Sequence, residues 1–190
     1  DAAKLADGIP LPALPALEAP FNLLVTGVGG TGVVTVGALV SMAAHLEGKG
    51  ASVLDFTGFA QKFGSVLSFV RIGRDPEAIN QVRIDRGSAD AVIGCDIVVS
   101  SSPKEALFGD AVFANVMMLG FAWQRGFVPV SLDALMLAIE LNNVAIEENK
   151  RAFFCGRLMQ ADPSALAAHL TPKTESATTL GDIIAHRSAF

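Results

Sequence analysis

Short apolar runs separated by polar and glycine-bearing segments predict strands along the first hundred residues. The predicted strands lie at 23–27, 51–56, 65–72, 81–84 and 96–101. After the first of these, apolar residues at helical spacing predict a helix over 31–47. The stretch "GSADAVIGCD", residues 87–96, predicts a short helix that leads into the last strand. The run 65–73 alternates only loosely, so its pairing direction stays open, but the alternation of strands and helices is typical of an α/β protein with a parallel core.

The second half of the chain predicts helices. They are "FANVMMLGFAWQRG" from Phe113, "SLDALMLAIELN" and "NVAIEENKRAFFCGRLM". Ser131 is expected to cap the second, because a serine hydroxyl accepts a hydrogen bond from a free N–H of the first turn. The fold class expected is therefore α/β: a Rossmann-like, mostly parallel sheet flanked by helices, with a helical C-terminal part.

Proline and polar content set the expected domain boundaries. Residues 1–20 contain four prolines and no basic stretch of the kind that opens a secretory signal, so we expect an extended linker. Residues 21–170 are expected to form the Rossmann-like domain, and the polar residues 171–190 an arm or linker. A chain that opens on such a connector is expected to be a piece of a longer protein.

Composition narrows the classes of function. The chain has 190 residues, 51% of them hydrophobic, yet no apolar run approaches the roughly 18 residues of a membrane span. The high proportion of hydrophobic residues therefore predicts a large buried surface or partner interface. A net charge of −5 without a basic cluster argues against nucleic acid as a ligand. Cys95 and Cys155 lack metal-ligand spacing, so we expect buried thiols in a reducing, cytoplasmic compartment.

The candidate chemistry lies in "LLVTGVGGTGVVTVGAL", residues 23–39. Its glycines fit the frame G-x-G-x-x-G, in which the first permits a tight turn, the second lets a phosphate approach the backbone, and the third lets the next helix pack closely. Free N–H groups at the start of that helix favour an anion, and a threonine hydroxyl lies beside them. The predicted anion cradle consists of Gly27, Gly29, Gly30, Thr31 and Gly32.

The identity of that anion stays open from the residues alone. Asp55 lies about 20 residues beyond the glycines, where a carboxylate often binds a ribose hydroxyl, but it also suits a plain strand end. The glycine turn can equally serve only to pack a helix on a sheet. Lys62 is a candidate cation for a phosphate or carboxylate, or else a solvated loop lysine. His45 is expected to interact with a helix C-terminus and Arg71 to be a structural charge.

Several longer stretches resemble one protein family. Residues 24–73, "LVTGVGGTGVVTVGALVSMAAHLEGKGASVLDFTGFAQKFGSVLSFVRIG", are similar to the gamma domain of the 2-oxoacid:ferredoxin oxidoreductases, above all the long fused bacterial indolepyruvate ferredoxin oxidoreductases. The stretches "ANVMMLGFAWQRGFVPVS" and "AIELNNVAIEENKRAF" resemble the helical part of that domain. The matches occur in family order over most of residues 21–160.

The resemblance implies a part of an enzyme. In this family thiamine diphosphate, bound between other domains or subunits, attacks a 2-oxo acid such as pyruvate or indolepyruvate, which loses carbon dioxide. Electrons pass to iron–sulfur clusters or ferredoxin, and coenzyme A takes the acyl group. We therefore expect no turnover from this chain alone, partner domains or subunits of the same oxidoreductase, ferredoxin, and a homo-oligomer. The glycine loop and residues 57–66 are the candidates for lining coenzyme A or the active centre. No nucleic-acid or membrane partner is expected.

The chain departs from the family in two places. Lys62, Phe63 and Gly64 stand where relatives usually have a basic residue and two glycines, which puts a ligand contact there in doubt. Between "DIVVSSSPKEAL" and "FGDAVFANVMM" the family carries several dozen more residues with additional sheet, so we expect a break in the chain between Ser102 and Ala111, or else a true deletion.

The alternatives to a gamma domain are a self-standing NAD-binding Rossmann protein and a non-catalytic scaffold.

Overall fold

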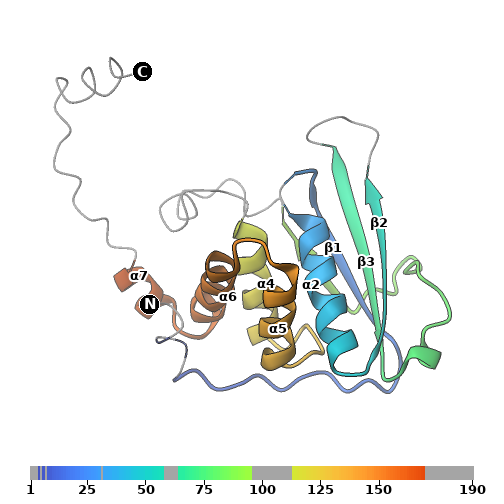
Figure 1. The fold of residues 1–190 in the computed structure, drawn as a ribbon, viewed down its shortest axis with the longest axis horizontal. Helices are drawn as coiled ribbons and strands as arrows, with labels where there is room; N and C mark the ends of the chain where they lie inside the picture. Colours follow the sequence, from blue (N-terminus) through green and yellow to red (C-terminus); the bar gives the residue numbers. More distant parts are fainter. Residues whose placement is uncertain are drawn as a thin grey trace, which may run out of the picture.

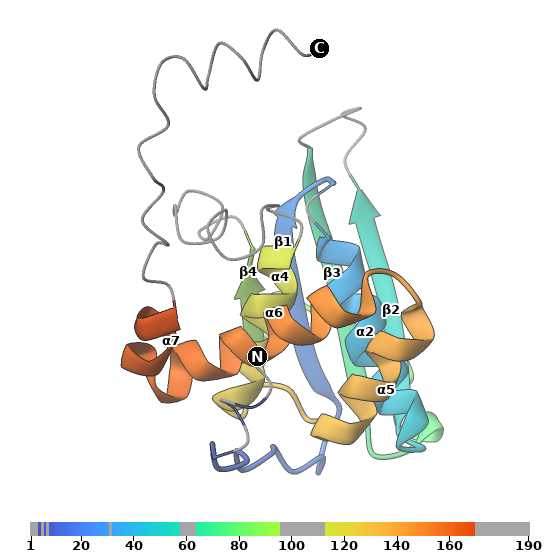
Figure 2. The ribbon, with the colours of Figure 1, turned by 60° about the vertical axis from the view of Figure 1, so that its left-hand side comes forward.

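The described residues fold into a four-stranded sheet with four α-helices on one side (Figure 1). A computed structural model describes residues 8–30, 32–57, 64–95 and 113–169, together with Lys4 and Ala6. The elements in chain order are β1 (Phe21–Val28), α2 (Val33–Leu46), β2 (Gly50–Thr57), β3 (Ser65–Gly73), the 3₁₀ helix η1 (Pro76–Ala78), β4 (Ala91–Gly94), α4 (Ala114–Gln124), α5 (Leu132–Asn142), α6 (Ile146–Ala161) and α7 (Pro163–His169). In Figures 1 and 2 the helices α2, α4, α5 and α6 lie on the same side of the strands.

The sheet has the strand order β2-β3-β1-β4. β1 pairs in parallel with β4, whereas β3 pairs antiparallel with both β1 and β2. The predicted α/β class with flanking helices is confirmed, and the described sheet is mixed where a mostly parallel one was expected. The physical reason is the short connection between Thr57 and Ser65, since a parallel return takes roughly a dozen or more residues.

Two predictions for residues 81–96 are wrong. Residues 81–84 are irregular and form no strand. Where 87–96 predicted a short helix, β4 forms instead, because the β-branched Val92 and Ile93 extend the sheet beside β1 and Ile93 is buried there. The predicted strand 96–101 and the expected break between Ser102 and Ala111 lie outside the described residues.

The helices predicted in the second half are confirmed. Ser131 caps α5 as expected: its hydroxyl accepts a hydrogen bond from the N–H of Ala134 at 3.2 Å. In α4 and α6, Gly120 and Gly156 face the backbone of the other helix, with too little room for a Cβ on either one. The glycines thus permit a backbone-to-backbone approach of α4 and α6.

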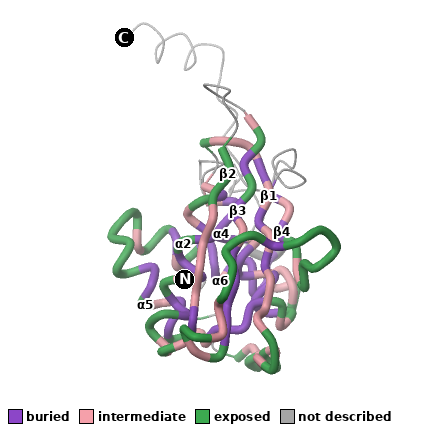
Figure 3. Tube along the Cα trace, turned by 90° about the vertical axis from the view of Figure 1, so that its right-hand side faces the viewer, coloured by how far each residue is buried: buried purple, intermediate pink, exposed green. Residues whose placement is uncertain are grey.

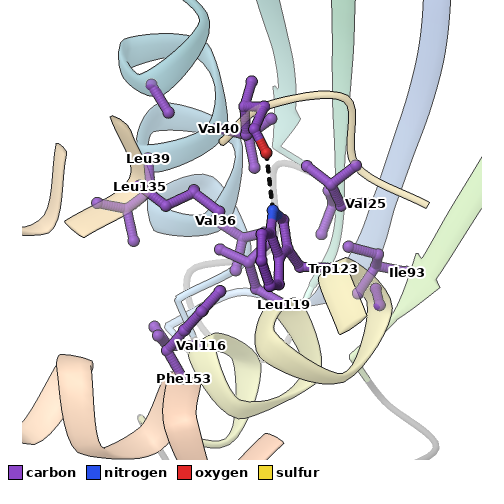
Figure 4. Close-up of a cluster of buried hydrophobic side chains, with 14 of the residues drawn as sticks. Val25, Val36, Leu39, Val40, Ile93, Val116, Leu119, Trp123, Leu135 and Phe153 are labelled. Atoms are coloured by element: carbon purple, nitrogen blue, oxygen red, sulfur yellow. Dashed lines mark hydrogen bonds between the residues drawn. The ribbon is translucent and has the colours of Figure 1, made fainter. Parts of the chain in front are cut away.

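The core fills the space between the sheet and these helices. Trp123 of α4 is 1% exposed and lies among side chains from α2, β1 and β4, as Figure 4 shows. Its indole Nε1 donates to the carbonyl oxygen of Val130 at 2.7 Å, which satisfies the one polar group of the ring. Cys95 and Cys155 are both buried, as expected of small apolar residues, and burial raises the pKa of the Cys155 thiol.

The proline-rich N-terminal segment contacts the folded domain. The side-chain amide of Gln124 donates to the carbonyl oxygen of Pro10 at 2.8 Å. Ile9 and Leu17 pack against the core. The domain boundaries at 20 and 170 remain predictions. Among the described residues, none of the helices combines the length and apolar character that crossing a membrane requires.

Candidate functional site

The glycine-rich segment folds as a strand end, a turn and a helix start. The motif had assigned the tight turn to Gly27. Gly27 is instead the seventh residue of β1 and pairs with Val66, so it lies within the strand. The turn depends instead on Gly30 and Gly32, whose φ angles of 87° and 88° are left-handed. Glycine adopts this conformation without the steric cost that a Cβ brings.

The N-terminus of α2 opens into a cavity at this turn. Gly32 is the N-cap residue and supplies no capping side chain, and the first turn contains no acidic residue. The first N–H groups of a helix have no intrahelical partner and carry partial positive charge, which favours an anion. The cavity measures about 310 Å³ and is lined by Val28, Gly29, Gly30, Gly32, Val33, Val34, Thr35 and Val66.

Gly29 contributes differently from the prediction. Its N–H donates to the carbonyl oxygen of Gly64 at 2.8 Å, which ties the turn to the start of β3 and directs this N–H away from a ligand. A Cβ on Gly29 would lie 3.5 Å from that same oxygen, an ordinary contact. Of the predicted cradle, the structure thus places Gly29, Gly30 and Gly32 at the cavity and Gly27 in the strand behind it. Thr31 and Lys62 lie outside the described residues.

The described residues that line the cavity suit the binding of a ligand, but they include no side chain that could act as an acid or base. Thr35 is the only one of them with a polar side chain, and no carboxylate, amine or imidazole is among the lining residues. Within the described ranges, no three His, Cys, Asp or Glu side chains gather as metal ligands. The cavity wall therefore suits an anionic group held by backbone N–H donors beside an apolar moiety held by valines.

Asp55 lies in the wrong place for a dinucleotide site at this turn. In the nucleotide-binding arrangement the acidic residue ends the strand beside β1. Here β3 lies between β1 and β2, so Asp55 is two strands from the glycine turn, on the order of 10 Å across the sheet. The geometry therefore favours the interpretation of Asp55 as a strand-end carboxylate.

The remaining candidates have structural surroundings. His45 lies in the last turn of α2, as expected for a residue near a helix C-terminus. Arg71 is 7% exposed, and its Nη1 donates to the carbonyl oxygen of Arg83 at 3.4 Å. That contact agrees with the structural charge expected from the sequence.

A second polar cluster, which sequence analysis missed, joins the end of α2 to the start of α5. The Glu47 carboxylate accepts from Lys49 Nζ at 2.6 Å and from the Ser131 N–H at 2.7 Å, and Lys49 also donates to the carbonyl oxygen of Pro129 at 2.7 Å. Burial raises the pKa of Glu47, but the hydrogen bonds outweigh it and hold the pKa below its ordinary value. The contact spans 84 residues of sequence, so no local pattern could reveal it.

Comparison with known proteins agrees with this fold. The profile of the family described as pyruvate ferredoxin/flavodoxin oxidoreductase matches residues 22–102. The chain is 36% identical over 153 residues to the indolepyruvate oxidoreductase subunit IorB of Thermococcus kodakarensis, a match that covers 77% of this chain and 67% of that subunit.

Solved structures share the fold at low sequence identity. The gamma subunit of a keto/oxoacid ferredoxin oxidoreductase from Geobacter sulfurreducens matches with a TM-score of 0.52 at 19% identity, over 74% of this chain and 98% of that one. A 2-oxoglutarate:ferredoxin oxidoreductase from Magnetococcus marinus matches with a TM-score of 0.54 at 17% identity, over 81% of this chain but only 32% of that one. The fold thus occurs both as a separate subunit and as a third of a longer chain. With the family profile and the IorB match, this chain belongs to the pyruvate ferredoxin/flavodoxin oxidoreductase family, as a domain of the gamma type.

Proposed function

We propose that the chain is the gamma domain of an indolepyruvate-type 2-oxoacid:ferredoxin oxidoreductase, which assists oxidative decarboxylation to an acyl-CoA without catalysing it alone. The observation that carries the proposal is the 36% identity to the IorB subunit over 77% of this chain. The match spans more than three quarters of this chain and is therefore not limited to the short glycine motif.

The chemistry is assigned to other domains or subunits. The whole chain contains two cysteines, fewer than the four thiolates that an iron–sulfur cluster needs, so a cluster must take its ligands elsewhere. The described cavity offers no acid or base for work on a 2-oxo acid. Thiamine diphosphate, the clusters and the docking of ferredoxin therefore belong to the partner parts in this proposal.

The test is turnover by the chain alone. The purified polypeptide is supplied with indolepyruvate, coenzyme A, thiamine diphosphate and methyl viologen, and viologen reduction is followed by absorbance. We expect no reduction above the protein-free control. Steady, substrate-dependent reduction would refute the proposal and show a complete catalyst.

We also propose that the glycine turn binds a phosphate group of coenzyme A, with Gly27, Gly29, Gly30, Thr31, Gly32 and Lys62 forming or supporting that contact. The support is the uncapped N-terminus of α2, the left-handed Gly30 and Gly32, and a cavity large enough for one end of a cofactor. The Magnetococcus relative was solved with coenzyme A bound. NAD is disfavoured here because Asp55 lies two strands away from the turn.

The chain offers a matched pair of variants for this contact. Gly30 and Gly87 both have left-handed φ angles, 87° and 77°, and a Cβ on either would meet nothing within 4 Å. Gly30→Asp and Gly87→Asp therefore carry similar backbone strain, but only the first places a carboxylate at the cavity. In the intact oxidoreductase we expect Gly30→Asp to weaken coenzyme A binding at least tenfold by titration calorimetry and Gly87→Asp to leave it unchanged. Equal affinities would mean that the turn serves packing only, and tighter binding of NAD than of coenzyme A would favour the dinucleotide alternative.

A further inference from the structure

The face of the sheet opposite α2 carries two apolar rows. The strand register aligns Leu54, Phe69, Leu24 and Val92 in one row across all four strands. The next row aligns Phe56, Leu67 and Thr26. We call the six apolar residues Leu24, Leu54, Phe56, Leu67, Phe69 and Val92 the open sheet face. Figure 3 views the molecule from this side.

The open sheet face is only partly covered by the part of the chain that the structure describes. Phe56 is 47% exposed, Leu67 36% and Val92 61%, whereas Val66 and Val70 of β3 and Ile93 of β4, which face the other side of the sheet, are buried. The segment between β3 and β4 lies over part of this side of the sheet: Asn22 Nδ2 donates to the carbonyl oxygen of Ser88 at 2.8 Å, and the Arg83 guanidinium lies over the Phe56 ring. Parallel sheets of α/β proteins normally have both faces covered, and the described residues do not complete a second layer on this face.

An aromatic and cationic edge flanks these rows. The guanidinium of Arg83 lies 5.8 Å from the centre of the Phe56 ring, and Phe56 packs edge-on against Phe69 with centroids 5.7 Å apart. No carboxylate among the described residues forms an ion pair with Arg83. Aromatic and arginine side chains of this kind dominate binding energy at protein interfaces.

We propose that the open sheet face is the docking surface for a catalytic domain or subunit of the same oxidoreductase, which covers it with an apolar surface and places a carboxylate opposite Arg83. This inference rests on the proposed function. The same fold forms only 32% of the Magnetococcus chain, so it occurs joined to other domains. Thr26 and Leu67 lie beside Gly27 and Val66, at the sheet end that leads into the glycine turn, so an occupant of this face reaches the edge of the proposed ligand site.

The size of the face argues against a second copy as the occupant. Two rows across four strands cover on the order of 300 Å², taking strands about 4.8 Å apart and same-face residues about 7 Å apart. A stable interface buries about 800 Å² from each partner. Stacking two copies through this face alone falls well short of that area. A catalytic partner that continues over the glycine turn adds the area that is missing.

Site-specific photo-cross-linking in the intact oxidoreductase tests the proposal. Benzoylphenylalanine is introduced at Phe56, at Val92, and at Leu141 as a control. Leu141 is 56% exposed, between the two test positions, and belongs to α5, which lies on the helix-covered side of the sheet (Figure 2). Cross-linked peptides are identified by mass spectrometry. We expect products between positions 56 and 92 and the thiamine-binding part, at several times the yield of position 141. Products with a second copy of this chain, or yields no higher than at 141, would overturn the proposal.

Two charge variants separate this inference from the proposed function. Phe56→Asp and Leu67→Asp change side chains that are already partly exposed, so we expect normal unfolding temperatures and at least tenfold weaker association with the rest of the oxidoreductase. Leu141→Asp is the control and is expected to associate normally. If the wild type associates and restores turnover but Phe56→Asp and Leu67→Asp do so equally well, the docking surface is wrong and the proposed function stands. If the wild type neither associates nor restores turnover, both are wrong.

Discussion

Replacing Gly156 by alanine tests the close packing of α4 against α6. A Cβ at this position would lie 2.8 Å from the Phe121 nitrogen and closer still to the Met117 carbonyl oxygen. The first of these is roughly 0.7 Å short of an optimal separation of about 3.5 Å. Both atoms belong to backbone, so no side chain can rotate away and the two helices must separate.

The expected cost follows from two opposing effects. Overpacking costs roughly 1–3 kcal/mol, and rigid backbone on both sides favours the upper end of that range. Alanine recovers about 1 kcal/mol through its better helix propensity. The net loss of unfolding free energy is therefore about 2 kcal/mol, which for a chain of this size lowers the unfolding temperature by roughly 4–8 °C.

Thermal unfolding followed by the fluorescence of Trp123 provides the assay, because that ring lies 5.8 Å from Phe153 of α6. Gly8→Ala is the matched control, since a Cβ on Gly8 would meet nothing within 4 Å. We expect the control to unfold within about 1–2 °C of the wild type, a change of about 0.5 kcal/mol or less. An unfolding temperature for Gly156→Ala at or above that of the wild type would refute the close approach of the two backbones.

Three further changes probe other contacts. Glu47→Gln removes the charge that Lys49 and the Ser131 N–H bind, so we expect a loss of about 1–2 kcal/mol at neutral pH in urea unfolding. Because the pKa of Glu47 is lowered in the folded protein, its stabilisation is fully present above the ordinary value near 4.5 and disappears as the pH falls through the folded pKa. At that low pH the unfolding free energy of the variant should approach that of the wild type. An equal difference in unfolding free energy at all pH values would contradict this. Ser131→Ala should cost about 1 kcal/mol through the lost cap of α5, and a thermal unfolding profile identical to the wild type would count against the cap. Trp123→Phe leaves the Val130 carbonyl oxygen unpaired in the core and should cost about 1–3 kcal/mol by circular dichroism, whereas a neutral result would show that the 2.7 Å hydrogen bond contributes nothing.

Local patterns predicted the elements that short-range physics determines. The apolar spacing and the Ser131 cap located α4, α5 and α6, because helix periodicity and capping depend on neighbouring residues. β4 was missed, since a short run containing Ala91 and Gly94 forms a strand only through its pairing with β1. The antiparallel direction of β3 follows from the short connection between Thr57 and Ser65, which the loose alternation of residues 65–73 does not reveal.

The candidate site was predicted in outline. The motif located the turn and the start of α2, but it assigned the tight turn to Gly27, whereas the left-handed residues are Gly30 and Gly32. It also could not show that the Gly29 N–H is bonded to Gly64, because that contact joins segments 35 residues apart in the sequence. The strand order that separates Asp55 from the turn is a tertiary property of the same kind.

Stoichiometric reconstitution tests whether this chain works only as one part of an indolepyruvate-type oxidoreductase. Oxidoreductase prepared without this chain is titrated with the purified polypeptide, and indolepyruvate- and coenzyme A-dependent reduction of ferredoxin is measured at each ratio. We predict low activity without the chain and a rise that saturates at one chain for each thiamine-binding site. A rate that does not change across the titration would contradict the account.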